Sequence, residues 1–311
     1  MRRPAYLLQR LCGALGLCLL LQCAAAAEEA QIFPEAEWPQ RSPAEAGLDI
    51  RKLDRIQKYL GGSGFISRGG YQVYAWGNYR SRQDIASAAK PWYTFFLFKA
   101  VEQGRLSSLD ERAARFEPRL NQINAPLGYK DQQITFRHLA NQTSCYGMRA
   151  APGTAFDYSD YQTALFWDIL FLKVYGASVK DADQKVLHPL LTDILQCQDS
   201  PTMMVFGTGE RPGRIGVSVR DFARFGWLYL NHGNWNGTQV ISEAHAIAAV
   251  TSPLSNSIPR TTAVAAEMCP NARSLGSGVI PDNQSDHEGS YSWMWWTNGV
   301  NRSGQRRFPD C

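Results

Sequence analysis

Hydrophobic and polar positions recur along the chain with two different periods, which predict helices in some segments and strands in others. Residues 50–60 repeat apolar positions at helical spacing, whereas residues 65–77 alternate like strand material, with a glycine break at residues 69–70. Gly104 ends one predicted helix as a C-terminal cap, and Ser218 begins another as an N-cap. The further predicted helices cover residues 87–103, 108–116, 134–140, 161–175, 218–231 and 242–250.

The last apolar segment, residues 290–297, predicts a single strand rich in tryptophan, followed by a turn at residues 298–299. Its apolar side chains fall on both faces: Tyr291, Trp293 and Trp295 on one, Met294 and Trp296 on the other. Such a strand is buried on both faces and needs neighbours on both edges. Residues 302–311 are too polar and too short to supply them, so we expect the natural domain to continue past Cys311.

The order of these elements predicts an α+β fold. Strands come first, helices fill the middle of the chain, and a strand comes at the end, so we expect the two ends of the chain to share one sheet. No linker rich in proline or serine divides the chain, which predicts one domain over residues 28–311.

Residues 1–27 have the features of a secretory signal. Two arginines open the segment, residues 11–21 form an apolar core, and the small residues Ala25-Ala26-Ala27 precede Glu28. The apolar core is too short for a membrane span. A lipid attachment at Cys23 is the weaker alternative, because Gln22 is bulky where such sites prefer a small residue. We therefore expect an exported protein, periplasmic or secreted, with no stable membrane span after removal of the signal.

Charge and cysteine content exclude several classes of function. The formal charge of +4 includes three leader arginines, so the mature chain is near +1 (29 basic minus 28 acidic residues), and its scattered bases do not predict a nucleic-acid groove. Four cysteines remain after the leader and allow three full disulfide pairings: Cys145, Cys197, Cys269 and Cys311. No metal-binding spacing occurs, and we expect neither a metal nor another cofactor.

Ser87-Ala88-Ala89-Lys90 is the candidate catalytic motif. Alone, such a tetrad is commonly a helix start with a capping serine and an exposed lysine. Its context favours chemistry, because the helix that follows is almost wholly apolar and must be buried. Residues one helical turn apart share a face, so Ser87 and Lys90 lie together at the positive end of that helix, and Pro91 is tolerated in its first turn. This arrangement suits a nucleophile that must lose a proton.

A second candidate is the loop of residues 152–160, where a Pro-Gly turn precedes Tyr158 and Asp160. A hydrogen-bonded loop tyrosine with an aspartate capping the next helix explains this pattern equally well when it is taken alone.

Taken together, these segments resemble the serine β-lactamase and penicillin-binding protein superfamily, in its class C-like branch. The resemblance covers residues 44–311 and rests on Ser87–Lys90, the Tyr158–Asp160 loop, residues 218–237 and the aromatic segment 291–296. It implies an antiparallel sheet flanked by helices plus a helical lobe, with Ser87, Lys90 and Tyr158 as catalytic residues and Asp160 at a substrate-binding position. It further implies an acyl-enzyme reaction on an ester, amide or lactam bond, with a small molecule or a peptidoglycan-type peptide as substrate, and we expect a monomer.

The sequence departs from the family pattern in two places. The third motif, K-T-G or H-x-G, should follow the aromatic segment; residues 287–289 have the letters H-E-G but precede it, so we interpret them as a loop. The oxyanion hole would then lack one donor, a loss that typically costs about 100- to 1000-fold in rate. Asp160 stands where the family has Asn, and an ionised carboxylate can only accept hydrogen bonds. We hypothesise that Lys90 stays charged and that Tyr158, as a phenolate, takes the Ser87 proton.

An α/β-hydrolase needs a G-x-S-x-G turn, and none is present; residues 207–213 lack the spacing of a phosphate-binding loop and predict a glycine-rich loop near the cleft. The rival to an enzyme is a non-catalytic module that binds peptidoglycan or β-lactam-like ligands. The specific acyl substrate stays open, since ester, amide, lactam and D-peptide chemistries share these residues.

Overall fold

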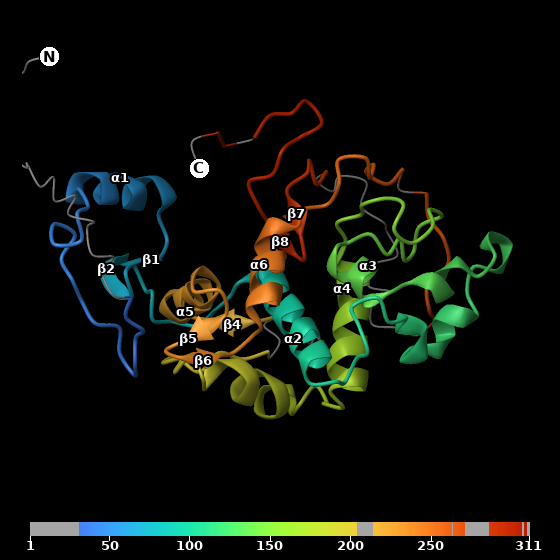
Figure 1. Cartoon of the computed structure of the whole chain (residues 1–311), viewed down its shortest axis with the longest axis horizontal. Coiled ribbons are helices and arrows are strands. Elements are labelled where there is room, and N and C mark those ends of the chain that lie inside the picture. Colours follow the sequence, from blue (N-terminus) through green and yellow to red (C-terminus); the bar gives the residue numbers. More distant parts are fainter. Residues whose placement is uncertain (1–30, 204–213, 263, 271–285, 307, 310–311) are drawn as a thin grey trace, which may run out of the picture. The chain divides into compact units, whose positions relative to one another are not determined.

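A buried helix, α2 (Lys90–Glu102), lies at the centre of the hydrophobic core in the computed structural model (Figure 1). The structure describes residues 31–203, 214–262, 264–270, 286–306 and 308–309, so the predicted signal and the glycine-rich segment 207–213 lie outside the described residues. From Ile32 onward the described residues belong to one unit of the chain. Within them, no helix has both the length and the apolar character that crossing a membrane requires.

Most of the predicted helices are present, but the one predicted over residues 108–116 is not, and η7 (Asp183–Thr192) was not predicted. The α-helices are α1 (Ile50–Leu60), α2, α3 (Phe136–Ala140), α4 (Asp160–Trp167), α5 (Val219–Leu230) and α6 (Glu243–Thr251). Two π-helical segments, η6 (Asp168–Val174) and η7 (Asp183–Thr192), and the 3-10 turns η1 (Ala86–Ala89), η2 (Ala113–Arg115), η3 (Pro118–Asn121), η4 (Ala125–Leu127) and η5 (Lys130–Gln133) complete the set in the described chain. Ser218 caps α5 as predicted, because its side chain accepts from the Asp221 N–H.

The strands of the described residues form four separate two-stranded antiparallel sheets. They are β1 (Gly64–Arg68) with β2 (Tyr71–Trp76), β3 (Gln83–Asp84) with β4 (Gly216–Val217), β5 (Asn234–Trp235) with β6 (Thr238–Gln239), and β7 (Tyr291–Ser292) with β8 (Trp295–Trp296). The α+β class is therefore confirmed. The prediction that both ends of the chain share one sheet is wrong for the described strands, since β1–β2 and β7–β8 do not pair.

The aromatic segment near the end of the chain is a tight hairpin, which corrects the prediction of one continuous strand. Tyr291 pairs with Trp296 and Ser292 with Trp295, so the chain reverses at residues 293–294. Both turn residues have positive φ, +48° at Trp293 and +68° at Met294, although neither is glycine. Residues 293–294 are not of the types that usually form turns, such as Gly, Asn or Pro, so the sequence did not predict the reversal.

Helix α2 is apolar on every side because it is surrounded by packed elements. Trp92 stacks on Phe225 of α5 with ring centroids 4.7 Å apart, and Phe96 meets Phe171 of η6 edge-on at 5.5 Å. The Thr94 hydroxyl donates to the Trp293 carbonyl at 2.8 Å, which ties the hairpin β7–β8 to the helix. Each fully buried aromatic side chain contributes about 1.5–3 kcal/mol relative to its exposed state. This burial fixes the position of Lys90 at the start of α2.

A helix predicted over residues 108–116 is present only as the 3-10 turn η2. The preceding backbone bonds across to residues 134–137 instead of along a helix: the Phe136 N–H donates to the Glu111 carbonyl, and the Arg137 N–H to the Leu109 carbonyl. In addition, the Ser108 hydroxyl accepts from the Asp110 N–H at 3.2 Å. Side-chain bonds of this kind compete with helix formation.

Candidate active site

Ser87 and Lys90 lie side by side where the 3-10 turn η1 runs into α2. Lys90 Nζ donates to Ser87 Oγ at 3.1 Å, as their spacing of three residues predicts. The α-helix itself begins at Lys90 rather than at Ser87, and Pro91 occupies its first turn. Ser87 is exposed, whereas Lys90 is only 4% exposed. The solvent-exposed hydroxyl of Ser87 therefore accepts a hydrogen bond from the buried amine of Lys90.

Tyr158 is the third predicted residue, and the structure places it against Lys90. Lys90 Nζ lies 4.7 Å from the centroid of the Tyr158 ring, which is a cation–π contact. Two aromatic side chains of the hairpin β7–β8 hold the ring from other directions: Tyr291 at 6.0 Å and Trp296 at 5.8 Å between centroids. The hairpin β7–β8, which was predicted from the sequence as a single strand, thus lies beside the predicted site.

Asp160 also meets Lys90, but from the solvent side. Its Oδ1 lies 3.4 Å from Lys90 Nζ, and its side chain is 95% exposed at the first turn of α4. Solvent screens an ion pair of this kind, so its contribution is small, on the order of 0–1 kcal/mol. Lys90 is consequently the common neighbour of Ser87, Tyr158 and Asp160, and the structure brings all four predicted residues together.

A polar network that the sequence did not predict holds the Tyr158 loop in place. The backbone N–H of Ser159 donates to Gln142 Oε1 at 2.9 Å, and the Ser144 hydroxyl donates to Gln162 Oε1 at 2.6 Å. Gln162 in turn donates to the Asp157 carbonyl. The first two pairs are 17 and 18 residues apart, a separation at which no local sequence pattern indicates a contact. They fix the backbone on both sides of Tyr158.

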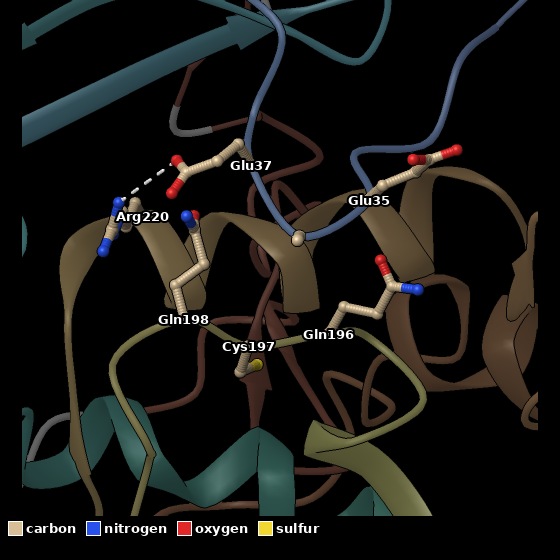
Figure 2. A pocket seen from close by; sticks show the side chains of 7 residues that line it. Glu35, Glu37, Gln196, Cys197, Gln198 and Arg220 are labelled. Carbon is tan, nitrogen blue, oxygen red and sulfur yellow. Dashed lines mark ion pairs between the residues drawn. The ribbon is translucent and has the colours of Figure 1, made fainter.

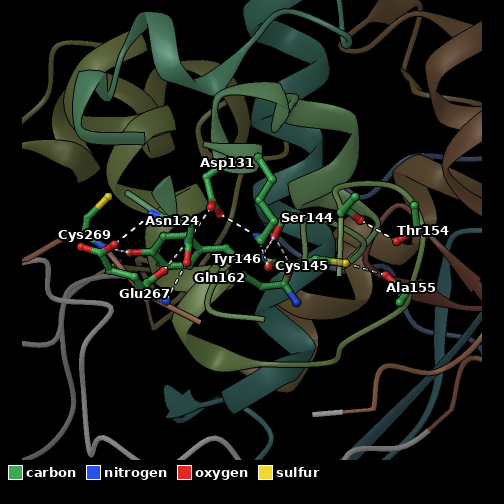
Figure 3. A network of polar contacts seen from close by, with 12 residues as sticks. Asn124, Asp131, Ser144, Cys145, Tyr146, Thr154, Ala155, Gln162, Glu267 and Cys269 are labelled. Carbon is green, nitrogen blue, oxygen red and sulfur yellow. Dashed lines mark hydrogen bonds and ion pairs between the residues drawn. The ribbon is translucent and has the colours of Figure 1, made fainter. Parts of the chain in front are cut away.

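The network continues away from the site through a buried ion pair (Figure 3). Lys130 Nζ lies 3.1 Å from Asp131 Oδ1 and donates to the Cys145 carbonyl at 2.9 Å. Asn124 donates to Asp131 Oδ2 at 2.7 Å and to the Glu267 carbonyl at 2.9 Å. Burial raises the pKa of Asp131, and the neighbouring ammonium of Lys130 opposes that shift. These additional bonds satisfy the buried pair and fix the Cys145 carbonyl next to Ser144.

Asp157 precedes Tyr158 and is 1% exposed. Burial raises the pKa of its carboxyl group, while the Tyr161 hydroxyl, which donates to Oδ2 at 2.5 Å, acts in the opposite direction. The side chain lies under the loop, so Asp157 supports the backbone of Tyr158.

The segment His287-Glu288-Gly289 is a loop, as interpreted from the sequence. His287 is 1% exposed, its Nδ1 accepts from the Gly289 N–H at 3.1 Å, and its Nε2 lies 2.8 Å from the Ile258 carbonyl. Because Nδ1 accepts, Nε2 carries the proton and donates to that carbonyl. Both ring nitrogens are occupied by backbone groups, so this histidine is not available for catalysis.

A pocket of about 530 Å³ lies elsewhere in the molecule and includes none of the four predicted residues (Figure 2). It is lined by Glu35, Ala36, Glu37, Gln196, Cys197, Gln198 and Arg220. The cation in it is already paired, since Arg220 contacts Asp199 at 2.7 Å and Glu37 at 3.7 Å. This pocket therefore lacks the nucleophile and amine that define the candidate active site.

The described cysteines are free thiols. Cys145 and Cys269 are buried, Cys197 is half-buried, and Cys311 lies outside the described residues. Burial raises the pKa of Cys145 to about 11, which keeps that thiol protonated at neutral pH. Within the described segments, no group of three or more His, Cys, Asp or Glu side chains could hold a metal ion.

Comparison with known proteins identifies the family. The beta-lactamase family model matches residues 49–304, and the chain belongs to that family. A solved structure assigned as a beta-lactamase, from Bacteroides dorei, aligns with a TM-score of 0.55 at 15% identity, covering 80% of this chain and 79% of its own. One assigned as a 6-aminohexanoate-dimer hydrolase, from Bacillus anthracis, aligns with a TM-score of 0.52 at 16% identity, covering 70% and 69%. No curated protein matches the chain.

These similarities confirm the β-lactamase/transpeptidase-like fold that the resemblance implied. At 15–16% identity, the two structures show the fold alone. The chemistry of this chain therefore has to be argued from its own residues.

Proposed function

We propose that this chain is a serine hydrolase that acts through an acyl-enzyme at Ser87 on an ester, amide or lactam bond. One observation carries the proposal: the exposed hydroxyl of Ser87 lies 3.1 Å from the Nζ of a lysine that is only 4% exposed. A nucleophile beside a group that orients it or takes up its proton is the arrangement that covalent catalysis requires. Membership of the beta-lactamase family supports this class of reaction, which covers β-lactamase, esterase and D-peptidase types.

The reaction proceeds in two steps. Ser87 Oγ forms a bond to the carbonyl carbon of the substrate while its hydroxyl proton passes to the base. The tetrahedral intermediate then expels the amine or alkoxide, which takes up that proton, and leaves an ester on Ser87. Water next attacks this ester while the base takes up one of its protons, and the base passes that proton to Ser87 Oγ as the acid product leaves.

Tyr158 is the base that we favour. Lys90 Nζ is paired with the carboxylate of Asp160 at 3.4 Å, so the amine already has a negative partner. It also lies over the ring of Tyr158, 4.7 Å from the centroid, which brings that side chain to the nucleophile's neighbour. Lys90 then orients Ser87 by donating to Oγ, and Tyr158 accepts the proton. Asp160 lies at the edge of the site, where it accepts hydrogen bonds from a substrate that carries N–H or O–H donors.

Covalent labelling tests the proposal. The full chain is incubated with a fluorophosphonate and, separately, with a fluorescent penicillin, and the modified residue is located by mass spectrometry. We expect one equivalent of label on Ser87, which the Ser87→Ala variant loses and the Ser303→Ala variant, changed at another exposed serine, retains. Absence of label on Ser87 with both reagents would overturn the proposal.

The same experiment separates the enzyme from a non-catalytic binding module. An enzyme releases the acyl group, so the mass of the penicillin adduct returns to that of the free chain, and product accumulates beyond one equivalent. A module that binds such ligands without turnover holds the adduct, or binds without forming one.

We further propose that the chain is exported and acts on a small molecule or a peptidoglycan-type peptide as a monomer. The apolar core of the first 27 residues and the alanines that precede Glu28 support export. Cell fractionation together with N-terminal sequencing of the mature protein tests it, and we expect the mature chain to begin at Glu28. A cytoplasmic protein that retains Met1 would contradict it.

A further inference from the structure

The carboxylate of Asp84 joins two parts of the chain immediately before Ser87. Asp84 is the last residue of β3, and its Oδ1 accepts from the backbone N–H of Ala86 at 2.8 Å. Its Oδ2 lies 2.5 Å from Nε of Arg214, which comes from the segment leading into β4. The side chain of Asp84 is 21% exposed, so water only partly screens these contacts. Ala86 is therefore held from one side by a carboxylate that is itself held by a guanidinium.

Ala86 needs such support because its backbone is left-handed. Its φ is +47°, a region in which a residue with a Cβ is disfavoured and which persists only where the surroundings enforce it. The unusual φ ends the extended strand β3 and starts the turn η1, which contains Ser87. The conformation of Ala86 thus decides where the exposed Ser87 hydroxyl lies relative to Lys90.

The antiparallel pairing of β3 with β4 places Arg214 for this contact. Asp84 pairs with Gly216, and the Ile85 N–H donates to the Ile215 carbonyl at 3.1 Å. Two backbone segments more than a hundred residues apart are thereby fixed to one another beside the nucleophile. Among the described residues, Asp84 is the ion-pair partner of Arg214.

We propose that Asp84 is a positioning residue for Ser87: its carboxylate, oriented by Arg214, holds Ala86 in the left-handed conformation that aims Ser87 Oγ at the acyl carbon. This inference rests on the proposed nucleophilic role of Ser87. Asp84 itself touches neither Ser87 Oγ nor Lys90 Nζ in any described contact, so it acts through the backbone. Misplacement of a nucleophile by about 1 Å can cost about 100-fold in rate.

A rescue experiment tests the positioning role in the full chain. The rate constant for fluorophosphonate labelling of Ser87 is measured for the wild type, for Asp84→Ala, for Ala86→Gly and for the double variant. We expect Asp84→Ala to lower the rate constant about tenfold or more, since the turn loses its support. In the Ala86→Gly background the same change should cost much less, because glycine adopts positive φ without strain. Asp84→Asn should lose less than Asp84→Ala, because an amide oxygen still accepts from the Ala86 N–H.

A matched control removes another aspartate–arginine pair. Asp110→Ala breaks the contact to Arg137, 2.6 Å long and also partly exposed, and we expect it to leave the labelling rate constant unchanged. Equal losses for Asp84→Ala in the Ala86 and the Ala86→Gly backgrounds would overturn the positioning role.

Thermal unfolding of the same four proteins separates this inference from the proposed function. If Ser87 of the wild type is never labelled, the proposed function fails, whatever Asp84 does. Unfolding still tests the support that Asp84 gives to Ala86. Asp84→Ala should lower the Tm by several degrees in the wild-type background and by clearly less in the Ala86→Gly background. Tm changes that simply add would show that Asp84 does not hold the conformation of Ala86.

Discussion

Lys90 and Asp160 form an ion pair whose two members stand in opposite environments. Lys90 Nζ lies 3.4 Å from Asp160 Oδ1, yet the lysine side chain is 4% exposed and that of the aspartate is 95% exposed. The desolvated partner depends on its neighbours for compensation, whereas water already stabilises the other. The carboxylate of Asp160 therefore compensates part of the charge on Lys90 but contributes little to the stability of the site.

Replacement of Asp160 by asparagine should change the rate of acylation only a little. Solvent screens this exposed carboxylate, so its contact with Lys90 contributes about 0–1 kcal/mol. Its loss should therefore change the rate constant by less than about fivefold. The measurement is the rate constant for Ser87 labelling at pH 7 for the wild type and Asp160→Asn.

Asp181→Asn serves as the control for that experiment, since it removes a half-buried aspartate paired with a lysine outside the site. A loss of a hundredfold or more in Asp160→Asn alone would contradict the minor contribution of this exposed carboxylate.

Tyr158→Phe should abolish most of the acylation while leaving the fold intact. The change removes one hydroxyl, and loss of a general base typically lowers the rate about 100- to 10,000-fold. The ring contacts with Tyr291 and Trp296 persist, so the free energy of unfolding should change little. Stopped-flow labelling of Ser87 and urea unfolding measure the two effects, with Tyr59→Phe, at a tyrosine 90% exposed, as the control. Near wild-type labelling by Tyr158→Phe would assign the base to Lys90 instead.

The sequence predicted the parts of the site that depend on local spacing. Ser87 and Lys90 are three residues apart, and a buried helix start brings them together whatever surrounds it. Tyr158 and Asp160 likewise share one loop, and both meet Lys90. Local periodicity also gave the bounds of α1, because a single amphipathic helix needs no distant partner to set its ends.

The sequence predicted neither the contacts between distant segments nor the shape of the aromatic hairpin. Asn141 Oδ1 accepts from the Trp293 N–H at 2.8 Å, across more than a hundred residues. That bond and the one from Thr94 hold Trp293 in a turn that its residue type disfavours. Tertiary contacts therefore stabilise a turn that the local residue propensities disfavour. Because those contacts are not visible in the sequence, the pattern of apolar residues predicted a continuous strand.

Thr94→Val should destabilise the protein because it breaks the link between α2 and that hairpin. The hydroxyl donates to the Trp293 carbonyl at 2.8 Å in a fully buried place, and valine fills the same volume without a donor. An unsatisfied buried carbonyl costs about 1–3 kcal/mol. Urea unfolding should show this loss, whereas Thr251→Val, at an exposed threonine that donates to the Ile247 carbonyl at 2.8 Å, should lose about 0.5 kcal/mol or less. Equal losses in both variants would contradict the structural role of the buried bond.

Glu102 makes the stability of the protein depend on pH in the acid range. Burial at the end of α2 raises the pKa of its carboxyl group, but bonds from His245 and Ser242 together with the charge of Lys99 outweigh burial and bring the pKa to about 2. His245 Nδ1 lies 2.8 Å from Oε1, the Ser242 N–H donates to the same atom at 2.9 Å, and Lys99 Nζ lies 3.2 Å from Oε2. The carboxylate thus joins the end of α2 to the start of α6.

Because the folded pKa of Glu102 lies below that of an unfolded glutamate, near 4.5, the carboxylate stabilises the folded state fully above about pH 5. That contribution is lost as the pH falls from about 4.5 to about 2, where both states bind the proton. Glu102→Gln should therefore reduce the free energy of unfolding by about 1–2 kcal/mol at pH 7, after allowance for solvent screening. The difference from the wild type should shrink steadily between pH 5 and 2, as followed by urea unfolding at each pH. Glu35→Gln, at an exposed glutamate, should show no such trend, and a constant difference for Glu102→Gln across that range would contradict the role of its charge.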